Sequence, residues 1–428
     1  MEKLYVKNVI SNLFAYRSHI FGEGSTYYGF EPKTSDQNGD QKLPDGFNSD
    51  HQYGKILYKN KDGDILKSGP VMIKFSPKAC FTRWILFSFT NEMIFYTKIL
   101  PVLNTPEVSV LGLFPKFYHG EIIFDVEQDH SALVLEDLTF KGYRMAEKKS
   151  FLDYQHLALM MRKLGQFHAH SYKAKNTVPD LFYPLANNFQ EAIQLMNGEY
   201  TDVLAKVGQR GLQQLQTDSA YSAYIPMITE MIQRSDDIFK QILTEGNHDA
   251  VSVIVHGDYL RNNVMFKYKN TNTPEPDDLV MLDMARYRYG SPVIDLVTVM
   301  YLHADQEMRN KHWNDLVDEY YTSLKETFPE NPVPSKDEIL SEFVEKSFFG
   351  YFVASYFLPL LIADDNNTHS ADVYECLSAS DEVSPSIDTL VDSMTKILLA
   401  EGGNEASQVL GDILRDLIDR GFICKKSA

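Results

Sequence analysis

Residues 251–296 read VSVIVHGDYLRNNVMFKYKNTNTPEPDDLVMLDMARYRYGSPVIDL. An apolar strand, residues 251–255, opens this stretch and ends in HGD, after which a polar loop follows. The run VMFKY then favours a second strand, the turn formers NTNTPEPDD predict a reversal of the chain, and LVMLD reads as the returning strand. The stretch therefore predicts a β-hairpin with polar residues at its open end.

The polar residues of this hairpin suit one reaction. If the two strands pair, Asn263 at the start of one lies beside Asp283 at the end of the other. Phosphoryl transfer depends on positioning and on neutralising charge. It needs one Asp to hold the attacking hydroxyl and accept its proton, and a second Asp with an Asn to hold Mg²⁺. Each of these residues taken singly is more often a turn or cap residue, but their combination is rarely accidental. We therefore predict catalytic roles for Asp258, Asn263 and Asp283, with Asn263 and Asp283 as metal ligands.

The bulk composition limits the class of protein. A chain of 428 residues with 44% apolar content suffices for two cores. The three cysteines form no disulfide framework, and the first residues do not resemble a secretory signal, so we expect a cytoplasmic protein that begins near Met1. A net charge of −18 argues against nucleic acid and anionic lipid as partners. The apolar run 348–363 is short for a membrane span, so we expect a buried helix and no membrane contact.

The first third of the chain favours β-structure. Residues 31–53 are polar and rich in turn formers, which predicts a mobile loop. Two β-favouring runs around the turn KDGD then predict a hairpin that carries Lys74 near its end. The next segment, RWILFSFTNEMIFYTKIL, predicts a helix with Glu92 near its middle, ended by Pro101.

Helices dominate after a short apolar strand, SALVLEDL, whose downstream residues FKGYRM suit a passage between two lobes. In DYQHLALMMRKLGQFHAH, apolar residues recur at helical spacing and predict one buried face. Ser335 and Glu338 resemble a capping box at the start of the helix KDEILSEFVEKSFFGYF. We predict an α+β protein with an N-terminal lobe of residues 1–137 and a larger helical lobe of residues 138–428.

The motifs HGDYLRNN and LDMARYRYGSPVIDL resemble the superfamily of aminoglycoside and choline kinases, and most closely the ecdysteroid kinase-like (CHK kinase-like) family. VMIKF, NEMIFYTKILP, LVLEDL and KLGQFHAHS match in the same order, from about Gly22 to Phe357. The resemblance implies a two-lobed protein-kinase-like fold and a kinase that phosphorylates a hydroxyl of a small molecule, such as an ecdysteroid or a similar lipophilic alcohol.

The resemblance also implies an ATP site between the lobes. Lys74 would contact the α- and β-phosphates and pair with Glu92, and the backbone of Glu136, Asp137 and Leu138 would meet the adenine. A lysine on a strand and a glutamate on the next helix are the elements that orient a nucleotide. Asp295 would anchor the catalytic loop from the start of a helix.

The sequence departs from the family at two places. Met284 and Ala285 follow Asp283 where Phe and Gln are usual, and Ala285 loses a polar contact. The glycine-containing residues 21–30 are the candidate for the loop that covers the phosphates, and an ordinary turn is an equal reading. His168, two residues from His170 on a predicted helix, reads as a core histidine rather than a metal ligand.

Two other functions remain open. An acidic, aromatic pocket could hold the ammonium group of choline or ethanolamine. A pseudokinase that binds nucleotide without turnover would fit the altered front loop and Ala285. The aromatic stripe from Phe348 to Phe357 is either core or the wall of a pocket for a flat apolar substrate. The sequence does not fix the oligomeric state or the acceptor.

Overall fold

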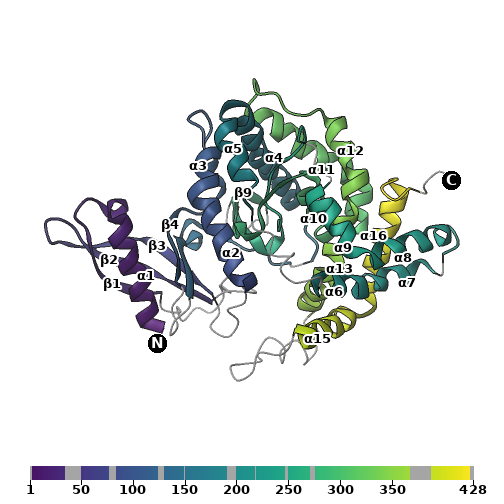
Figure 1. The fold of residues 1–428 in the computed structure, drawn as a ribbon, viewed down its shortest axis with the longest axis horizontal. Coiled ribbons are helices and arrows are strands. Elements are labelled where there is room, and N and C mark those ends of the chain that lie inside the picture. The colour runs from purple at the N-terminus through teal and green to yellow at the C-terminus, as the bar shows by residue number, and fades with distance from the viewer. Residues whose placement is uncertain are drawn as a thin grey trace.

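The computed structural model describes residues 2–33, 50–76, 83–123, 130–148, 150–189, 199–216, 218–245, 249–269, 275–366 and 387–424. A β-sheet region with one flanking helix lies at one end of the molecule, and a large, mostly helical region forms the rest (Figure 1). The α+β architecture with a β-rich N-terminal lobe and a helical C-terminal lobe is therefore confirmed.

The N-terminal sheet has five strands in the order β1-β2-β3-β5-β4, all paired antiparallel. The strands are β1 (Thr26–Pro32), β2 (Asp50–Lys59), β3 (Ile65–Phe75), β4 (Phe117–Ile123) and β5 (His130–Glu136). Side chains alternate between the faces of a strand. On β3, Val71 and Ile73 are fully buried in the cluster that packs under helix α1 (Glu2–Arg17), whereas Lys74 faces the opposite side.

The predicted hairpin around KDGD is present, because β2 and β3 pair antiparallel on either side of a turn at Asn60–Asp64. The predicted loop 31–53 is shorter than expected. Its first residues belong to β1, which ends at Pro32, and β2 already begins at Asp50. Residues 34–49, the rest of that prediction, lie outside the described residues. β-pairing to a neighbouring strand extends the sheet into polar sequence that has little β-propensity of its own.

The helix after β3 continues past Pro101, contrary to the prediction. Helix α2 (Arg83–Ile94) passes into a π-helical turn (Phe95–Ile99) and then into the short helix α3 (Leu100–Leu103). Pro101 lies in the first turn of α3, where a missing N–H does no harm. The π-turn joins α2 to α3 without a break, so Pro101 lies inside a continuing helical segment rather than at its end.

The chain crosses between the lobes directly after β5. Leu138–Lys141 form one 3-10 turn, and β6 (Tyr143–Arg144) then pairs with β8 (Val264–Tyr268) of the second lobe. β8 also pairs with β9 (Pro276–Met281), and β7 (Val253–Val255) pairs with β10 (Arg288–Gly290). The chain thus runs from β5 into the second lobe at FKGYRM, and the predicted hairpin of β8 and β9 is present.

Helices build the remainder of the second lobe. They are α4 (Tyr154–Thr177), α5 (Pro179–Ala186), α6 (Glu199–Val207), α7 (Gln209–Leu215), α8 (Ile225–Gln233), α9 (Ser235–Lys240), α10 (Val293–Leu302), α11 (Gln306–Thr327), α12 (Lys336–Lys346), α13 (Phe348–Asn366), α15 (Ile387–Ala400) and α16 (Gly403–Asp419). In α4 the predicted face of Leu157, Met160, Met161, Leu164 and Phe167 is completely buried.

The capping box at Ser335 and Glu338 is confirmed at the start of α12. However, α12 ends at Lys346, and α13 starts at Phe348 as a separate helix, where one continuous helix was predicted. α13 is long and apolar enough to cross a membrane, but 72% of its most apolar window is buried inside the protein. It is placed as a core helix, as predicted.

Candidate active site

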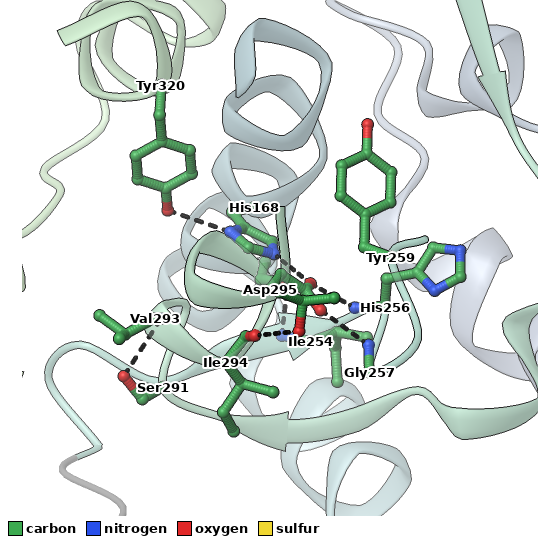
Figure 2. A network of polar contacts seen from close by, with 12 residues as sticks. His168, Ile254, His256, Gly257, Tyr259, Ser291, Val293, Ile294, Asp295 and Tyr320 are labelled. Atoms are coloured by element: carbon green, nitrogen blue, oxygen red, sulfur yellow. Dashed lines mark hydrogen bonds and ion pairs between the residues drawn. The ribbon is translucent and has the colours of Figure 1, made fainter. Parts of the chain in front are cut away.

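Asp295 fixes the loop that follows β7. Its carboxylate accepts hydrogen bonds from the backbone N–H groups of His256 (2.7 Å) and Gly257 (2.9 Å), as Figure 2 shows. Asp295 lies in the first turn of α10 and also contacts His168 Nε2 at 3.3 Å, while Tyr320 bonds the other ring nitrogen. The expected structural roles of Asp295 and His168 are therefore confirmed. The loop is held from a helix terminus that lies 38 residues further along the chain.

The backbone turns sharply at Gly257, as predicted. Gly257 has φ +78°, and a Cβ at this position would lie 2.0 Å from the carbonyl oxygen of Arg286. His256 braces the loop through a 2.9 Å contact between Nε2 and the carbonyl oxygen of Leu282. These contacts tie the start of the catalytic loop to the segment that follows β9.

The hairpin brings the predicted catalytic residues together. Val264 of β8 pairs with Met281 of β9, and the N–H of residue 282 donates to the carbonyl of Asn263 over 2.8 Å. The Asn263 side-chain amide donates to the backbone oxygen of Asp258 (2.8 Å) and to its carboxylate (3.1 Å). Asp283 is close enough to Asp258 to shift its pKa. The three residues therefore share one site, as the strand pairing predicts.

Lys74 joins the two lobes at this site. Its ammonium lies 2.7 Å from the Glu92 carboxylate and 3.3 Å from the Asp283 carboxylate. Glu92 is buried in α2, and the next residue toward the N-terminus, Asn91, donates its side-chain amide to the backbone oxygen of Ala285 at 3.1 Å. The predicted pair of Lys74 and Glu92 is present. Helix α2 is thus tied directly to the turn that carries Asp283.

The charges of the site act on one another. Burial raises the pKa of the Asp258 carboxyl, the Arg286 guanidinium lowers it, and the Asp283 carboxylate raises it again, with the net result above the usual value. Burial acts most strongly to raise the pKa of Asp283, but the Lys74 ammonium, together with Arg286 and His256, holds this pKa below its usual value. For Glu92, burial exceeds the opposing effect of Lys74, so its pKa is raised. Asp258 is thus the more basic of the two Asp residues.

Residues 21–30 do not lie where the prediction of a phosphate-covering loop requires. Thr26 of β1 pairs with Lys59, at one end of β2, whereas Lys74 pairs with His51 at the other end. Gly22 and Gly24 therefore lie at the end of the sheet that is away from Lys74. The connection from β1 to β2 leaves the sheet at the Lys74 end instead, and its residues 34–49 lie outside the described part of the chain. The spacing of the glycines alone does not show at which end of the sheet they lie relative to Lys74.

His51 is a neighbour of Lys74 that the sequence prediction missed. Residues opposite each other in an antiparallel pair project to the same face of the sheet, so His51 shares the face of Lys74. Burial, reinforced by the charge of Lys74, lowers the pKa of His51 to about 4. At neutral pH its ring is therefore uncharged and adds no positive charge beside Lys74.

The predicted adenine-contacting segment lies at the crossing between the lobes. The N–H of Glu136 donates to the carbonyl of Lys116, and the N–H of Asp137 donates to that of Pro70. Asp137 Oδ1 accepts from the backbone and the hydroxyl of Thr139, which shapes the turn that begins at Leu138. The segment is therefore held rigidly at the end of β5.

The donor set next to Lys74 fits a hard divalent cation. Asp283 adopts the left-handed backbone region (φ 57°), and within the described residues its buried Oδ1 atom has no hydrogen-bond partner. Mg²⁺ prefers one or two carboxylates together with phosphate and water oxygens. No group of three or more His, Cys, Asp and Glu side chains gathers for a metal in the described ranges. The arrangement therefore suits Mg²⁺ bound jointly with a nucleotide, and Asp283 and Asn263 would hold it.

A small pocket of about 10 Å³ lies beside Asp258 and Gly257. One wall is apolar and consists of Phe239, Phe349, Val353 and Phe357, and the polar side adds Arg286, Arg288 and Thr298. Phe349, Val353 and Phe357 follow one another at four-residue spacing on one face of α13. Phe348, Tyr351 and Phe352 of the same helix are buried in the core. Phe349 and Val353 belong to the same buried core, so the aromatic stripe is mainly core and borders the pocket at one face of α13.

Several residues of the site were not found from sequence. Asn91, Arg286, Arg288 and His303 reach it only through tertiary contacts; His303 accepts a hydrogen bond from the N–H of Arg261 at 2.8 Å. Asn91 and Arg286 lie close in sequence to the motif residues Glu92 and Asp283. This proximity is the one signal by which they could have been found.

Solved structures of low similarity include the GDP complex of wild-type aminoglycoside 2'-phosphotransferase-IIIa, at 14% identity and a TM-score of 0.35, over 92% of this chain and 99% of that one. The AMP-bound complex of spectinomycin phosphotransferase is 10% identical, with a TM-score of 0.34, over 83% of this chain and 90% of that one. No curated protein is significantly similar to the chain.

A sequence profile, in contrast, matches more than half of the chain. It covers residues 54–330, which include β3 with Lys74, the helix with Glu92 and the whole hairpin from Asp258 to Asp283. The profile is that of the Ecdysteroid kinase-like family, and the chain belongs to this family.

Proposed function

We propose that the protein transfers the γ-phosphoryl group of ATP, with Mg²⁺, to a hydroxyl group of a small and largely apolar alcohol, such as an ecdysteroid or a related compound. The observation that carries this proposal is the position of Asp258. It lies between the charged cluster of Lys74 and Asp283 on one side and a small pocket against α13 on the other.

Each residue has a definite task in this reaction. Asp258 holds the acceptor hydroxyl and takes its proton, and its raised pKa makes it a stronger base than an ordinary Asp. Lys74, kept in place by Glu92, binds the α- and β-phosphates. When bound between Asn263 and Asp283, Mg²⁺ would neutralise charge on the phosphates. Leu138 and its neighbours at the lobe crossing would meet the base.

The acceptor is oriented by the pocket. A flat, apolar body against Phe349 and Phe357 would place one hydroxyl near the Asp258 carboxylate, and because the pocket holds only about 10 Å³, its wall must shift to admit such an acceptor. Burial of apolar surface contributes about 25 cal/mol per Å² to binding. A choline- or ethanolamine-type acceptor is less well supported, because Arg286 and Arg288 line the same pocket and repel an ammonium group.

The proposal of an inactive pseudokinase is also less well supported. The ion pairs from Lys74 to Glu92 and Asp283 are formed, and Asn91 contacts the backbone at Ala285, where the family's usual polar side chain is missing. These contacts support an active kinase over an inactive pseudokinase.

The decisive experiment measures transfer of labelled phosphate from ATP to a panel of hydroxylated steroids, choline and ethanolamine. Phosphorylation of a steroid alcohol, abolished by omission of Mg²⁺, supports the proposal. Labelling of choline or ethanolamine alone would establish the alternative acceptor class. Thermal stabilisation by ATP with Mg²⁺ but no labelling of any acceptor would support the pseudokinase.

A further inference from the structure

Arg286 acts on both Asp residues of the site. Its Nε atom lies 4.0 Å from Oδ2 of Asp258. Against burial, which raises the pKa of the Asp258 and Asp283 carboxyls, the charge of Arg286 acts to lower the pKa of both. Asp258 follows β7 on the acceptor side of the site, and Asp283 follows β9 on the nucleotide side. The guanidinium is therefore placed where these two sides meet.

The backbone of Arg286 is fixed, whereas its side chain reaches solvent. Residues Met284–Arg286 form one 3-10 turn, and a Cβ on Gly257 would lie 2.0 Å from the carbonyl oxygen of Arg286. The Arg286 side chain is 24% exposed. At 4.0 Å its pair with Asp258 is longer than a hydrogen bond, so a phosphate oxygen can draw the guanidinium without first breaking a hydrogen bond to Asp258.

Phosphoryl transfer at this site calls for a second cation. The charge of Lys74 is largely offset, because its ammonium lies 2.7 Å from the Glu92 carboxylate and 3.3 Å from the Asp283 carboxylate. The triphosphate adds further negative charge, and during transfer this charge spreads over the equatorial oxygens of the moving group. Within the described residues, Arg286 is a cation that contacts the carboxylate on the acceptor side.

The turn that carries Arg286 has lost a polar group at the preceding position. Ala285 stands where Gln is usual in the family, and the Ala285 side chain offers no polar contact. Its backbone is held by the Asn91 amide at 3.1 Å, so the turn keeps its place. Arg286, the next residue, supplies a polar side chain from the same turn.

We propose that Arg286 is a further catalytic residue, whose guanidinium contacts the oxygens of the phosphoryl group during its transfer. The inference rests on the proposed function and deepens it. The acceptor oxygen forms its bond to phosphorus as the bond to the oxygen that bridges the β- and γ-phosphates breaks, the hydroxyl proton passes to Asp258, and ADP leaves. The planar fork of Arg matches paired phosphate oxygens, and it acts most strongly on charge that develops in the transition state.

The first test compares two complexes of ADP and Mg²⁺ that imitate different stages of the reaction. Beryllium fluoride stands in for the bound γ-phosphate, and aluminium fluoride stands in for the phosphoryl group in transfer. Calorimetry gives the dissociation constants for the unmodified protein and for Arg286→Gln. We expect the variant to lose about 10²-fold in affinity for the aluminium complex, the size of one transition-state donor, and to keep most of its affinity for the beryllium complex. An equal loss for both complexes would place Arg286 on the ground-state phosphates and overturn the inference.

Kinetics separate this role from an effect on Asp258 alone. A residue that only tunes the pKa of the base changes the pH at which activity falls, but not the kcat well above that pH. Arg286→Gln should lower kcat by about 10²-fold at high pH as well, with little change in the KM for ATP, and Arg286→Lys should retain part of the activity. A kcat at high pH equal to that of the unmodified protein overturns the inference.

Arg162→Gln is the matched control. It removes a guanidinium that pairs with Glu319 at 2.9 Å, between α4 and α11 and apart from the residues of the site. This variant should keep both the kcat at high pH and the preference for the aluminium complex. The ratio of the two dissociation constants within each protein is independent of how much of it folds.

The inference and the proposed function fail separately. If no acceptor is phosphorylated, the proposed function fails, while a preference for the aluminium complex that Arg286→Gln loses still assigns Arg286 to the phosphoryl group. An unmodified protein that binds the two complexes equally, or binds neither, overturns the inference.

Discussion

The side-chain amide of Asn91 donates a hydrogen bond to the backbone oxygen of Ala285 across 194 positions of sequence. Asn91 precedes Glu92, and Ala285 follows Asp283 by two residues, so this contact links the helix whose Glu92 pairs with Lys74 to the turn that carries Asp283. Both residues are buried. The alignment of the two lobes therefore depends in part on one amide.

Asn91→Leu should weaken turnover more than folding. The substitution leaves a buried carbonyl without this donor, which costs about 1–3 kcal/mol, and it frees the turn that bears Asp283. We expect about a tenfold lower kcat and a higher Mg²⁺ requirement in steady-state assays. Thr90→Val on the same helix removes only a bond to Leu86 and should be close to the unmodified protein. Equal kinetics for both variants would contradict the assignment.

Asp258→Ala should remove the base without removing the nucleotide site. The expected loss of turnover is on the order of 10² to 10⁴, the usual contribution of a general base. Thermal stabilisation by ATP with Mg²⁺ should persist, because Lys74 and Asp283 are unchanged. Phosphate transfer at the unmodified rate would exclude Asp258 from the reaction.

Asp283→Asn should uncouple nucleotide binding from Mg²⁺. The variant loses the carboxylate whose Oδ1 has no hydrogen-bond partner among the described residues and whose Oδ2 contacts Lys74. We expect the melting-temperature difference between ATP with Mg²⁺ and ATP alone to shrink strongly. A metal titration that superimposes on that of the unmodified protein would show that Asp283 is not a ligand.

The pH at which activity falls on acidification should depend on the charged groups beside Asp258. A base must be deprotonated, so kcat/KM falls as pH drops through the pKa of Asp258, which lies above the usual value. Arg286 lowers this pKa, and Arg286→Gln should therefore shift this fall to higher pH. The pH profile of kcat/KM for both proteins is the measurement. A shift of the profile of Arg286→Gln to lower pH would contradict the effect of Arg286 on Asp258.

Asp295→Asn should destabilise the protein as well as inactivate it. Asparagine cannot accept at both of its terminal atoms, so the N–H of His256 or of Gly257 loses its partner in a buried site. The expected loss is about 2–4 kcal/mol of unfolding free energy by denaturant titration. Asp305→Asn, at the exposed start of α11, is a control that retains an N-cap side chain and should cost little. A stable but inactive Asp295→Asn protein would point to a role in chemistry instead of support.

Local patterns in the sequence determined the catalytic hairpin, the strand with Lys74 and the buried face of α4. In each case the pattern and its structure lie within about 30 residues, where strand alternation, turn formers and helical spacing act directly. The pairing of Asn263 with the end of β9 followed from the turn between the strands. The sequence also identified Lys74 and Glu92 as partners, because a strand and the helix after it are neighbours in space.

Only the tertiary structure decided what surrounds these residues. The place of Gly22 and Gly24 at the far end of the sheet depends on strand register, and the continuation of the helix through Pro101 depends on a π-turn that packs against the core. The pocket joins Asp258 to a helix face about a hundred residues further along the chain. Contacts of that separation arise from the packing of the whole chain, so no single segment carries their pattern.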